Sequence, residues 1–325
     1  MTTGVLITNL GTPDDATTGA LRRYLAEFLW DRRVVDMPRL KWWLILHGII
    51  LRMRPKRVAE SYRKVWTEDG GPLLIISQQQ RKAIQQLLED KLGGPVPVVL
   101  GMRYGNPSIS SALDKLQQQG VERIIVLPLF PQYSAATTGS TFDAVSRVLQ
   151  QWRRVPELIF INQYHSHPGY IDALANSIEE QWSGHGPADH RLLLSFHGLP
   201  QRYHDAGDPY QGQCNATAVA LAERLGLQDG ELQTIFQSRF GKDEWLKPYA
   251  EETLRMLPAE GVRDVDIVCP GFSADCVETL EEIAIQNRDL FLESGGREYR
   301  YIPALNSRKD HIETLSGIIL DHWGE

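Results

Sequence analysis

Cysteine is scarce in this sequence. The 325 residues include only Cys214, Cys269 and Cys276, and none of them forms a C-x-x-C pair. A small, odd number of cysteines in a long chain argues against a disulfide framework and favours a reducing, cytoplasmic setting. The first residues, Met-Thr-Thr-Gly, lack the basic start and apolar core of an export signal, so we expect no signal peptide.

Excess basic charge and long apolar runs are also absent. The chain has 34 Lys and Arg against 41 Asp and Glu, a net charge of −7, which makes nucleic acid an improbable partner. The apolar stretch at residues 42–51 is about half as long as a bilayer crossing requires. This stretch fits a buried helix and fits equally a lip that touches a membrane surface or a greasy ligand. Glycine patterns for nucleotides are missing at the strand–helix junctions.

The dominant pattern is a short apolar strand, a turn rich in Gly or Pro, and an amphipathic helix. Strands are predicted at residues 5–10, 96–102, 124–130 and 158–161, and again at 192–196, 232–237, 265–269 and 298–302. Continuous apolar strands alternating with helices predict parallel sheets covered on both faces. We therefore expect an α/β fold with two similar doubly wound domains, residues 1–160 and 161–325, each with about four parallel strands. Packing of the final helix back on the first domain is an alternative that stays open.

His197 ends the first strand of the second half and begins a turn with Gly198 and Pro200. A turn histidine is often a surface side chain that bonds its own loop. Its position at the carboxyl end of a buried parallel strand points further, because ligands of open α/β sheets bind outside those ends. The strand-end position therefore favours a functional role for His197, with the surface role as the alternative.

Three carboxylates, Asp275, Glu278 and Glu282, follow another strand end and turn. At about 100° per residue, an α-helix would place them within roughly 60° of one another. One interpretation is a solvated acidic face near a helix N-terminus, where carboxylates suit the helix dipole. The other is a row that carries a cation or protons, since oxygen ligands and one imidazole suit a loosely held ferrous ion.

Basic side chains border the apolar stretch at residues 42–51. Arg52, Arg54, Lys56 and Arg57 follow it directly. An apolar strip beside arginines suits a flat, greasy ligand with carboxylate tails, because arginine binds carboxylates through two parallel hydrogen bonds. An ordinary helix with a basic last turn explains the same pattern equally well.

Four stretches together resemble the ferrochelatase family: residues 127–134 with 137–140, residues 195–200, residues 207–210 and residues 275–282. The resemblance extends over nearly the whole chain, from residues 9–13 to the final helix. It implies a chelatase-like fold of two Rossmann-like domains with a porphyrin cleft between them. It also implies a lyase that inserts ferrous iron into protoporphyrin IX to give protoheme, the last step of heme biosynthesis.

The resemblance also implies roles for particular residues. It places the family's active-site histidine on His197 and its essential glutamate on Glu278, both as catalytic residues and metal ligands. Asp275 and Glu282 match further acidic positions on a path for protons or metal. The positions that match the porphyrin pocket are Asn9, Leu10, Arg54, Tyr62, Arg103 and Tyr133.

Some residues depart from the family pattern. Ala135 and Ala136 stand in a loop where some relatives have a cluster cysteine, so we predict no iron–sulfur cluster. No permanently bound cofactor is expected, and ferrous iron is a substrate. Cys276 stands where some relatives have histidine, which puts a second imidazole near the metal in doubt.

Two alternatives for the function stay open at this point. The first is a chelatase for coproporphyrin or another tetrapyrrole, and the second is a non-catalytic two-domain protein that binds a tetrapyrrole. The expected partners are a porphyrin and ferrous iron, with a monomer favoured and a peripheral membrane contact compatible with the apolar stretch. For His197 we favour proton acceptance, assisted by Glu278, over metal binding.

Overall fold

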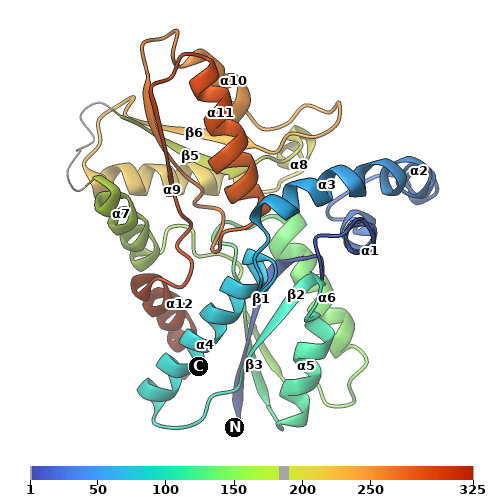
Figure 1. Cartoon of the computed structure of the whole chain (residues 1–325). Coiled ribbons are helices and arrows are strands. Elements are labelled where there is room, and N and C mark those ends of the chain that lie inside the picture. The colour runs from blue at the N-terminus through green and yellow to red at the C-terminus, as the bar shows by residue number, and fades with distance from the viewer. Residues whose placement is uncertain (1, 183–189, 325) are drawn as a thin grey trace. The chain divides into compact units, whose positions relative to one another are not determined.

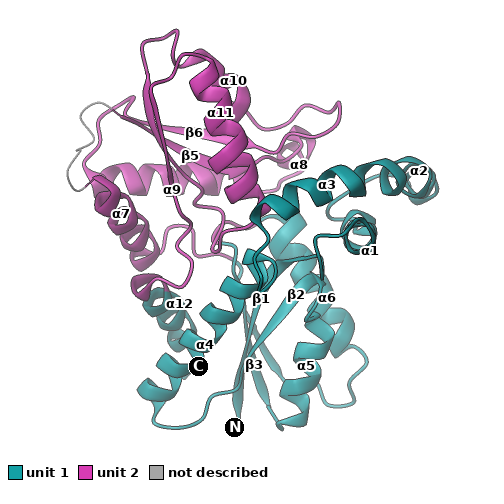
Figure 2. Cartoon of the chain, viewed as in Figure 1, with its two compact units in different colours: residues 1–130, 134–162, 312–325 teal, residues 131–133, 163–311 magenta. Residues whose placement is uncertain are grey.

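The computed structural model describes residues 2–182 and 190–324, and Figure 1 traces the chain. The chain divides into two compact units (Figure 2). Unit 1 comprises residues 1–130, 134–162 and 312–325, and unit 2 comprises residues 131–133 and 163–311. Within the part of the chain that is described, no helix has both the length and the apolar character needed to cross a membrane.

Unit 1 is built on a sheet of four parallel strands in the order β2-β1-β3-β4. The strands are β1 (Thr3–Thr12), β2 (Val98–Gly105), β3 (Arg123–Pro128) and β4 (Glu157–Phe160). The central strands are almost wholly buried, since their side chains are apolar on both faces. This burial on both faces explains why their sequences read as continuous apolar runs rather than alternating ones.

Helices cover both faces of this sheet. Helices α5 (Ile109–Gln118) and α6 (Ser140–Leu149) pack on one face through a core that includes Leu6, Leu113, Val126 and Val145. Helices α4 (Pro72–Leu92) and α12 (Lys309–Asp321) lie on the opposite side in Figure 1. The C-terminal part of α12, from residue 312, belongs to unit 1.

A helical excursion leaves the sheet between β1 and α4. It consists of α1 (Thr18–Trp30), α2 (Arg39–Ile45), the π-helical segment η1 (Leu46–Ile50) and α3 (Leu51–Val65). A separate apolar cluster holds it, in which Trp42 is buried and donates from Nε1 to the Leu29 carbonyl at 2.7 Å. Leu46 and Leu51 are buried in the same cluster.

Unit 2 repeats the architecture with a parallel sheet in the order β6-β5-β7-β8. Its strands are β5 (Arg191–His197), β6 (Leu232–Gln237), β7 (Asp264–Val268) and β8 (Glu298–Ile302). In both sheets the first strand lies between the second and the third. Such an order creates a switch point between the first and third strands, where crossovers leave in opposite directions.

The helices of unit 2 again cover both faces of the sheet. On one face α10 (Ala250–Met256), the π-helical segment η4 (Glu278–Asn287) and α11 (Arg288–Glu293) share a core with Leu193, Ile235 and Ile267. On the other side, α7 (Pro168–Trp182) packs against α9 (Tyr210–Leu225). The short helix α8 (Gln201–Asp205) follows the turn after β5.

The fold class predicted from the sequence, two similar Rossmann-like domains with four-stranded parallel sheets, is confirmed. All eight expected strands are present within one or two residues of their expected positions at most ends. The predicted domain boundary between residues 160 and 161 stays a prediction. The two units described above are compact units defined from the structure.

Gly11 offers a test of how closely β1 and β2 pair at their carboxyl ends. Its φ is +109°, and a Cβ there would lie 1.8 Å from the Tyr104 carbonyl oxygen. Gly70 has a similar φ of +119° but open space around it. We expect Gly11→Ala to lower the free energy of unfolding by about 4 kcal/mol or more, and Gly70→Ala by about 1–2 kcal/mol. Urea unfolding of both variants measures the difference, and equal losses would contradict a backbone clash at Gly11.

Candidate functional site

His197 is the last residue of β5 and lies at the switch point of the unit 2 sheet. The ring is half-buried, and its Nδ1 lies 2.7 Å from the Gly198 carbonyl oxygen. A carbonyl oxygen accepts hydrogen bonds only, so Nδ1 carries the proton in the neutral ring. The lone pair is therefore on Nε2, the atom that can accept a proton or bind a metal.

Glu278 begins the helix that follows β7, and this helix is π-helical from Glu278 to Asn287. The sequence predicted an α-helical wheel here, and that geometry is wrong. A π-helix closes its hydrogen bonds over five residues rather than four, so its turns are wider. Such segments are frequent at functional sites, and the segment 42–51 and the loop after β3 also contain π-helical turns, η1 and η2 (Ala135–Gly139).

Glu282 lies one turn along η4 and is clamped by Ser238, which follows β6. The Ser238 N–H donates to Glu282 Oε1 at 2.7 Å, and the Ser238 hydroxyl donates to Oε2 at 2.5 Å. Burial raises the pKa of Glu282 above its usual value, although the bonds from Ser238 and the nearby His197 ring act in the opposite direction. The charge of Glu278 also raises the pKa of Glu282. His197 and Glu278 thus both act electrostatically on Glu282, and we call these three residues one electrostatic group.

Asp275 precedes η4 and is not part of the helix, so the expected helical face does not include it. Its buried carboxylate accepts hydrogen bonds from Thr279, Tyr301 and Asn306 at 2.9, 2.5 and 2.7 Å. These contacts tie the start of the helix to β8 and to the segment after it. Its role on a proton or metal path stays a prediction.

A small open pocket gives solvent access to Glu282. The space in it that the centres of water molecules can occupy is about 20 Å³, and its walls include Gln237, Ser238, Arg239, Tyr249 and Glu251. Since about 10–15 Å³ of such space holds one water molecule, the pocket has room for about one water or one small cation. The arrangement can thus place a single water or small cation beside the Glu282 carboxylate.

Gln237 and Ser238 were not predicted as site residues. Both stand at the carboxyl end of β6, and Gln237 is paired with His197 in the sheet. The available signal was the one used for His197, namely polar residues directly after an apolar strand. Without the strand order, the sequence does not say that β5 and β6 are neighbours.

In unit 1, two of the predicted porphyrin residues lie within β1. Asn9 is buried and donates from Nδ2 to the Ser77 hydroxyl at 3.2 Å, whereas Leu10 is half-buried. Arg103, in β2, donates from Nε to the Ser140 carbonyl at 2.9 Å and forms an ion pair with Asp31. The Arg103 guanidinium thus already has a buried partner, and its contact with a porphyrin stays a prediction.

Arg54 and Tyr62, both on α3, are the other unit 1 candidates. Arg54 is half-buried, and burial together with the charge of Arg57 lowers its pKa. A cation in such surroundings gains from a carboxylate partner more than an exposed cation does. Tyr62 is buried with its ring centroid 6.1 Å from that of Trp66.

Tyr133 is also a predicted porphyrin residue, and it belongs to unit 2. It lies in the segment of residues 131–133, which is not part of the unit 2 sheet. Its N–H donates to Gln213 Oε1 at 2.7 Å, and its side chain is half-buried. The site residues therefore fall into two groups, one in each unit, and the structure brings residues together within each group.

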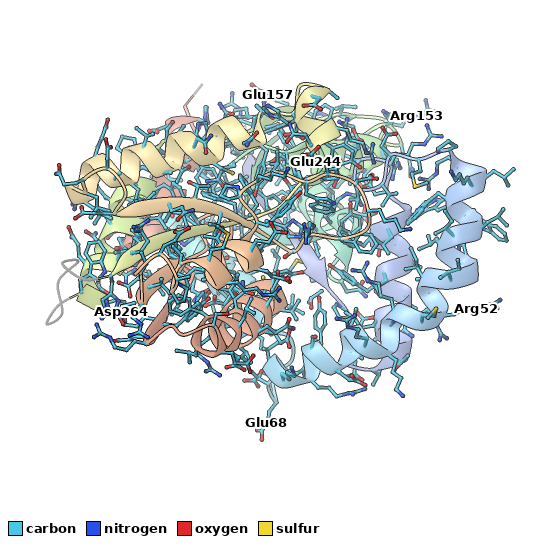
Figure 3. The ribbon with its side chains drawn as sticks, turned by 90° about the horizontal axis from the view of Figure 1, so that it is seen from above. Arg52, Glu68, Arg153, Glu157, Glu244 and Asp264 are labelled. Atoms are coloured by element: carbon cyan, nitrogen blue, oxygen red, sulfur yellow. The ribbon has the colours of Figure 1, made fainter. Side chains whose placement is uncertain are left out.

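Residues 40–51 and the start of α3 form what we call the lip. One side of the lip is buried through Trp42, Leu46 and Leu51, as a buried helix would be. The other side exposes apolar side chains at fractions of 48 to 78%. Arg52 points outward from α3 in Figure 3. The exposed apolar side chains of the lip are Leu40, Trp43, Leu44, Ile49 and Met53. Their contact with a membrane surface or an apolar ligand stays a prediction.

A second group with metal-binding atoms lies at the amino end of the unit 2 sheet, where His190, Asp264 and Glu298 approach one another. Arg297 binds both oxygens of Asp264, and Arg300 lies 3.9 Å from Glu298. These arginines already neutralise the carboxylates, so the group is better described as an ion-pair network than as a metal site.

Comparison with protein families identifies relatives along the whole chain. The family model described as Ferrochelatase matches residues 2–323. A ferrochelatase of Thioalkalivibrio sulfidiphilus is 58% identical over 317 residues, covering 98% of this chain and 86% of the relative. A ferrochelatase of Nitrosococcus oceani is 55% identical over 325 residues, covering 99% of this chain and 88% of the relative.

Solved structures share the fold at low sequence identity. The structure of SirB from Bacillus subtilis with Fe3+ has a TM-score of 0.61 and 12% identity, covering 100% of this chain and 96% of SirB. CbiX, described as the terminal enzyme for biosynthesis of siroheme in denitrifying bacteria, has a TM-score of 0.55 and 13% identity, with 98% of each chain covered. At these identities the likeness shows the fold alone.

The raised pKa of Glu282 predicts a pH-dependent stability. Because the folded chain holds this proton more tightly than the unfolded chain, the contribution of Glu282 is fully present below the unfolded pKa of about 4.3. It is lost as the pH rises through the raised folded pKa. Glu282→Gln cannot ionise, so the variant should gain stability relative to the wild type as the pH rises from about 4 to 8. Urea unfolding across this range measures the gain, and a difference that does not change with pH would refute the assignment.

Proposed function

Since this chain belongs to the ferrochelatase family, we propose that it inserts ferrous iron into protoporphyrin IX and so completes the synthesis of protoheme. The observation that carries the proposal is the group at the unit 2 switch point. There His197, with its Nδ1 bonded to its own turn, lies in one electrostatic group with Glu278 and Glu282. The reaction replaces two pyrrole protons of the porphyrin with one Fe2+, so it needs a proton acceptor and a place for a cation.

His197 supplies the proton acceptor. Its Nδ1–H is engaged with the Gly198 carbonyl, so Nε2 faces the reaction as a base. A pyrrole N–H gives its proton to Nε2, and the resulting imidazolium is stabilised by the nearby carboxylates of Glu278 and Glu282. Each turnover releases two protons, which these carboxylates can pass toward solvent through the pocket beside Glu282.

Glu278 and Glu282 supply oxygen ligands for the incoming cation. Ferrous iron accepts carboxylate oxygens and imidazole nitrogen, so the same residues suit an ion that is held briefly and then released into the ring. The raised pKa of Glu282 means that it binds a proton more readily than an exposed carboxylate does. Asp275 supports this path from the start of the helix.

The porphyrin is a flat apolar ring with two propionate tails. We assign its contacts to the predicted residues in unit 1 and to Tyr133. Arg54 suits a propionate, because its guanidinium is partly buried beside another cation. Apolar walls that grip the ring help to bend it, so that a nitrogen lone pair points out of the ring plane. The other assigned residues are Asn9, Leu10, Tyr62 and Arg103.

The remaining proposals concern partners and location. Iron–sulfur clusters of the [2Fe–2S] and [4Fe–4S] types are held by four cysteine thiolates, and this sequence has three cysteines. We therefore propose an enzyme without an iron–sulfur cluster. We also propose a monomer that acts in the cytoplasm, with peripheral attachment to membranes through the lip. The lip supports the attachment because exposed apolar side chains adjoin a basic run that attracts anionic lipid heads.

Removal of the His197 ring tests the function. We expect His197→Ala to lower the rate of iron insertion by about 10²- to 10⁴-fold, because the general base is lost. Protoporphyrin affinity, measured by fluorescence quenching, should stay within about threefold of the wild type. The assay mixes protein, protoporphyrin and ferrous ion without oxygen and follows the absorption spectrum.

The matched control for this experiment is His204→Ala, which removes an exposed histidine on α8 and should leave turnover unchanged. Full turnover by His197→Ala would overturn the proposed role of the ring. The same assay with coproporphyrin tests which porphyrin is the substrate. Faster turnover of coproporphyrin than of protoporphyrin would identify coproporphyrin as the natural substrate.

The lip predicts binding to anionic membranes. We expect the double variant Trp43→Ser and Leu44→Ser to bind vesicles of phosphatidylcholine and phosphatidylglycerol about tenfold more weakly than the wild type, because two apolar side chains no longer enter the bilayer surface. Co-sedimentation measures the bound fraction. Val155→Ser, an exposed apolar residue outside the lip, serves as the control and should bind like the wild type. Wild-type protein that stays in the supernatant at low salt would refute the membrane contact.

A further inference from the structure

Gln237 is buried at the carboxyl end of β6, directly beside His197 in the sheet. Its main-chain carbonyl accepts the Gly198 N–H at 2.8 Å. Gly198 is also the residue whose carbonyl accepts the hydrogen bond from His197 Nδ1–H. The backbone of Gln237 therefore holds the turn that orients the histidine ring.

The side chain of Gln237 reaches in another direction. Its Nε2 donates to the main-chain carbonyl of Glu278 at 3.0 Å. Glu278 is the first residue of η4, so this bond fixes the start of the π-helix. Gln237 thus contacts both the histidine turn and the residue that carries the essential carboxylate.

The orientation of the amide is set by its other neighbours. Ser195 donates its hydroxyl to Gln237 Oε1 at 2.7 Å, and the Cys269 thiol lies 3.6 Å from the same oxygen. The Glu278 carbonyl only accepts, so the NH2 group must face it, which leaves the amide oxygen to face Ser195 and Cys269. The amide has no second orientation that satisfies all three neighbours.

We propose that Gln237 is a positioning residue that sets the spacing between His197 Nε2 and the Glu278 carboxylate. The inference rests on the proposed function, in which these two groups handle protons and iron together. A π-helical start has wider turns than an α-helix, so external donors determine where its first residues lie. Misplacement of a catalytic group by about 1 Å can cost on the order of 10²-fold in rate.

The helix has a second external donor that provides a matched comparison. Tyr299 donates its hydroxyl to the Ile283 carbonyl at 2.8 Å, one turn further along η4. Both bonds join a side chain to a carbonyl of the same π-helix. Of the two, the Gln237 bond ends at Glu278 and extends from the strand beside His197.

The test compares Gln237→Met with Tyr299→Phe in the full chain. Methionine preserves the length of the side chain and removes its donor. We expect Gln237→Met to lower kcat by about 10- to 100-fold and to raise KM for ferrous iron. Its affinity for protoporphyrin should be unchanged. Tyr299→Phe should retain kcat and both KM values within about twofold per folded molecule, with rates corrected for the folded fraction at the assay temperature.

The outcomes distinguish a failure of the proposed function from a failure of the positioning role of Gln237. A wild type that inserts no iron refutes the proposed function, whatever the variants do. A wild type that inserts iron, with Gln237→Met equal to it or changed no more than Tyr299→Phe, overturns the positioning role alone. A loss in Gln237→Met that follows only the folded fraction, with KM for iron unchanged, also overturns it.

Discussion

The switch point of the unit 2 sheet is the constraint on which the candidate site depends. Because β5 lies between β6 and β7, the loops after these strands start at one edge and leave in different directions. His197, Ser238 and the turn toward η4 start at this edge without any rearrangement of the sheet. The same order of strands in unit 1 places Asn9 and Leu10 near the corresponding edge.

The positions of the three acidic residues depend on a second constraint, namely the hydrogen bonds that each of them makes. Glu282 is held by the hydroxyl and N–H of Ser238, and Asp275 is held by Tyr301 and Asn306. Glu278 is instead fixed through its main chain by Gln237. The Glu278 carboxylate also has a side-chain hydrogen bond with Cys276, so its position depends on both its backbone and its side chain.

Much of this arrangement could be predicted from the sequence, for a physical reason. Strands buried on both faces are continuous apolar runs, and His197 directly follows such a run. The π-helix could not be predicted, because donors from β6 and β8 bond its carbonyls. The pairing of Arg103 with Asp31 could not be predicted either, because it joins residues 72 positions apart. The sequence of the lip does not distinguish its buried side from its exposed side, since a helix that buries Trp42 can still expose Trp43.

The bond between His197 Nδ1 and its own turn also has a kinetic consequence. A neutral ring whose proton is committed to Gly198 has one lone pair to offer. If that pair accepts the pyrrole protons, an iron that reaches it first occupies the base and delays deprotonation. The two substrates would then compete for a single atom. An ordered sequence in which porphyrin binds before iron would avoid that competition, and an excess of free ferrous ion would act as an inhibitor.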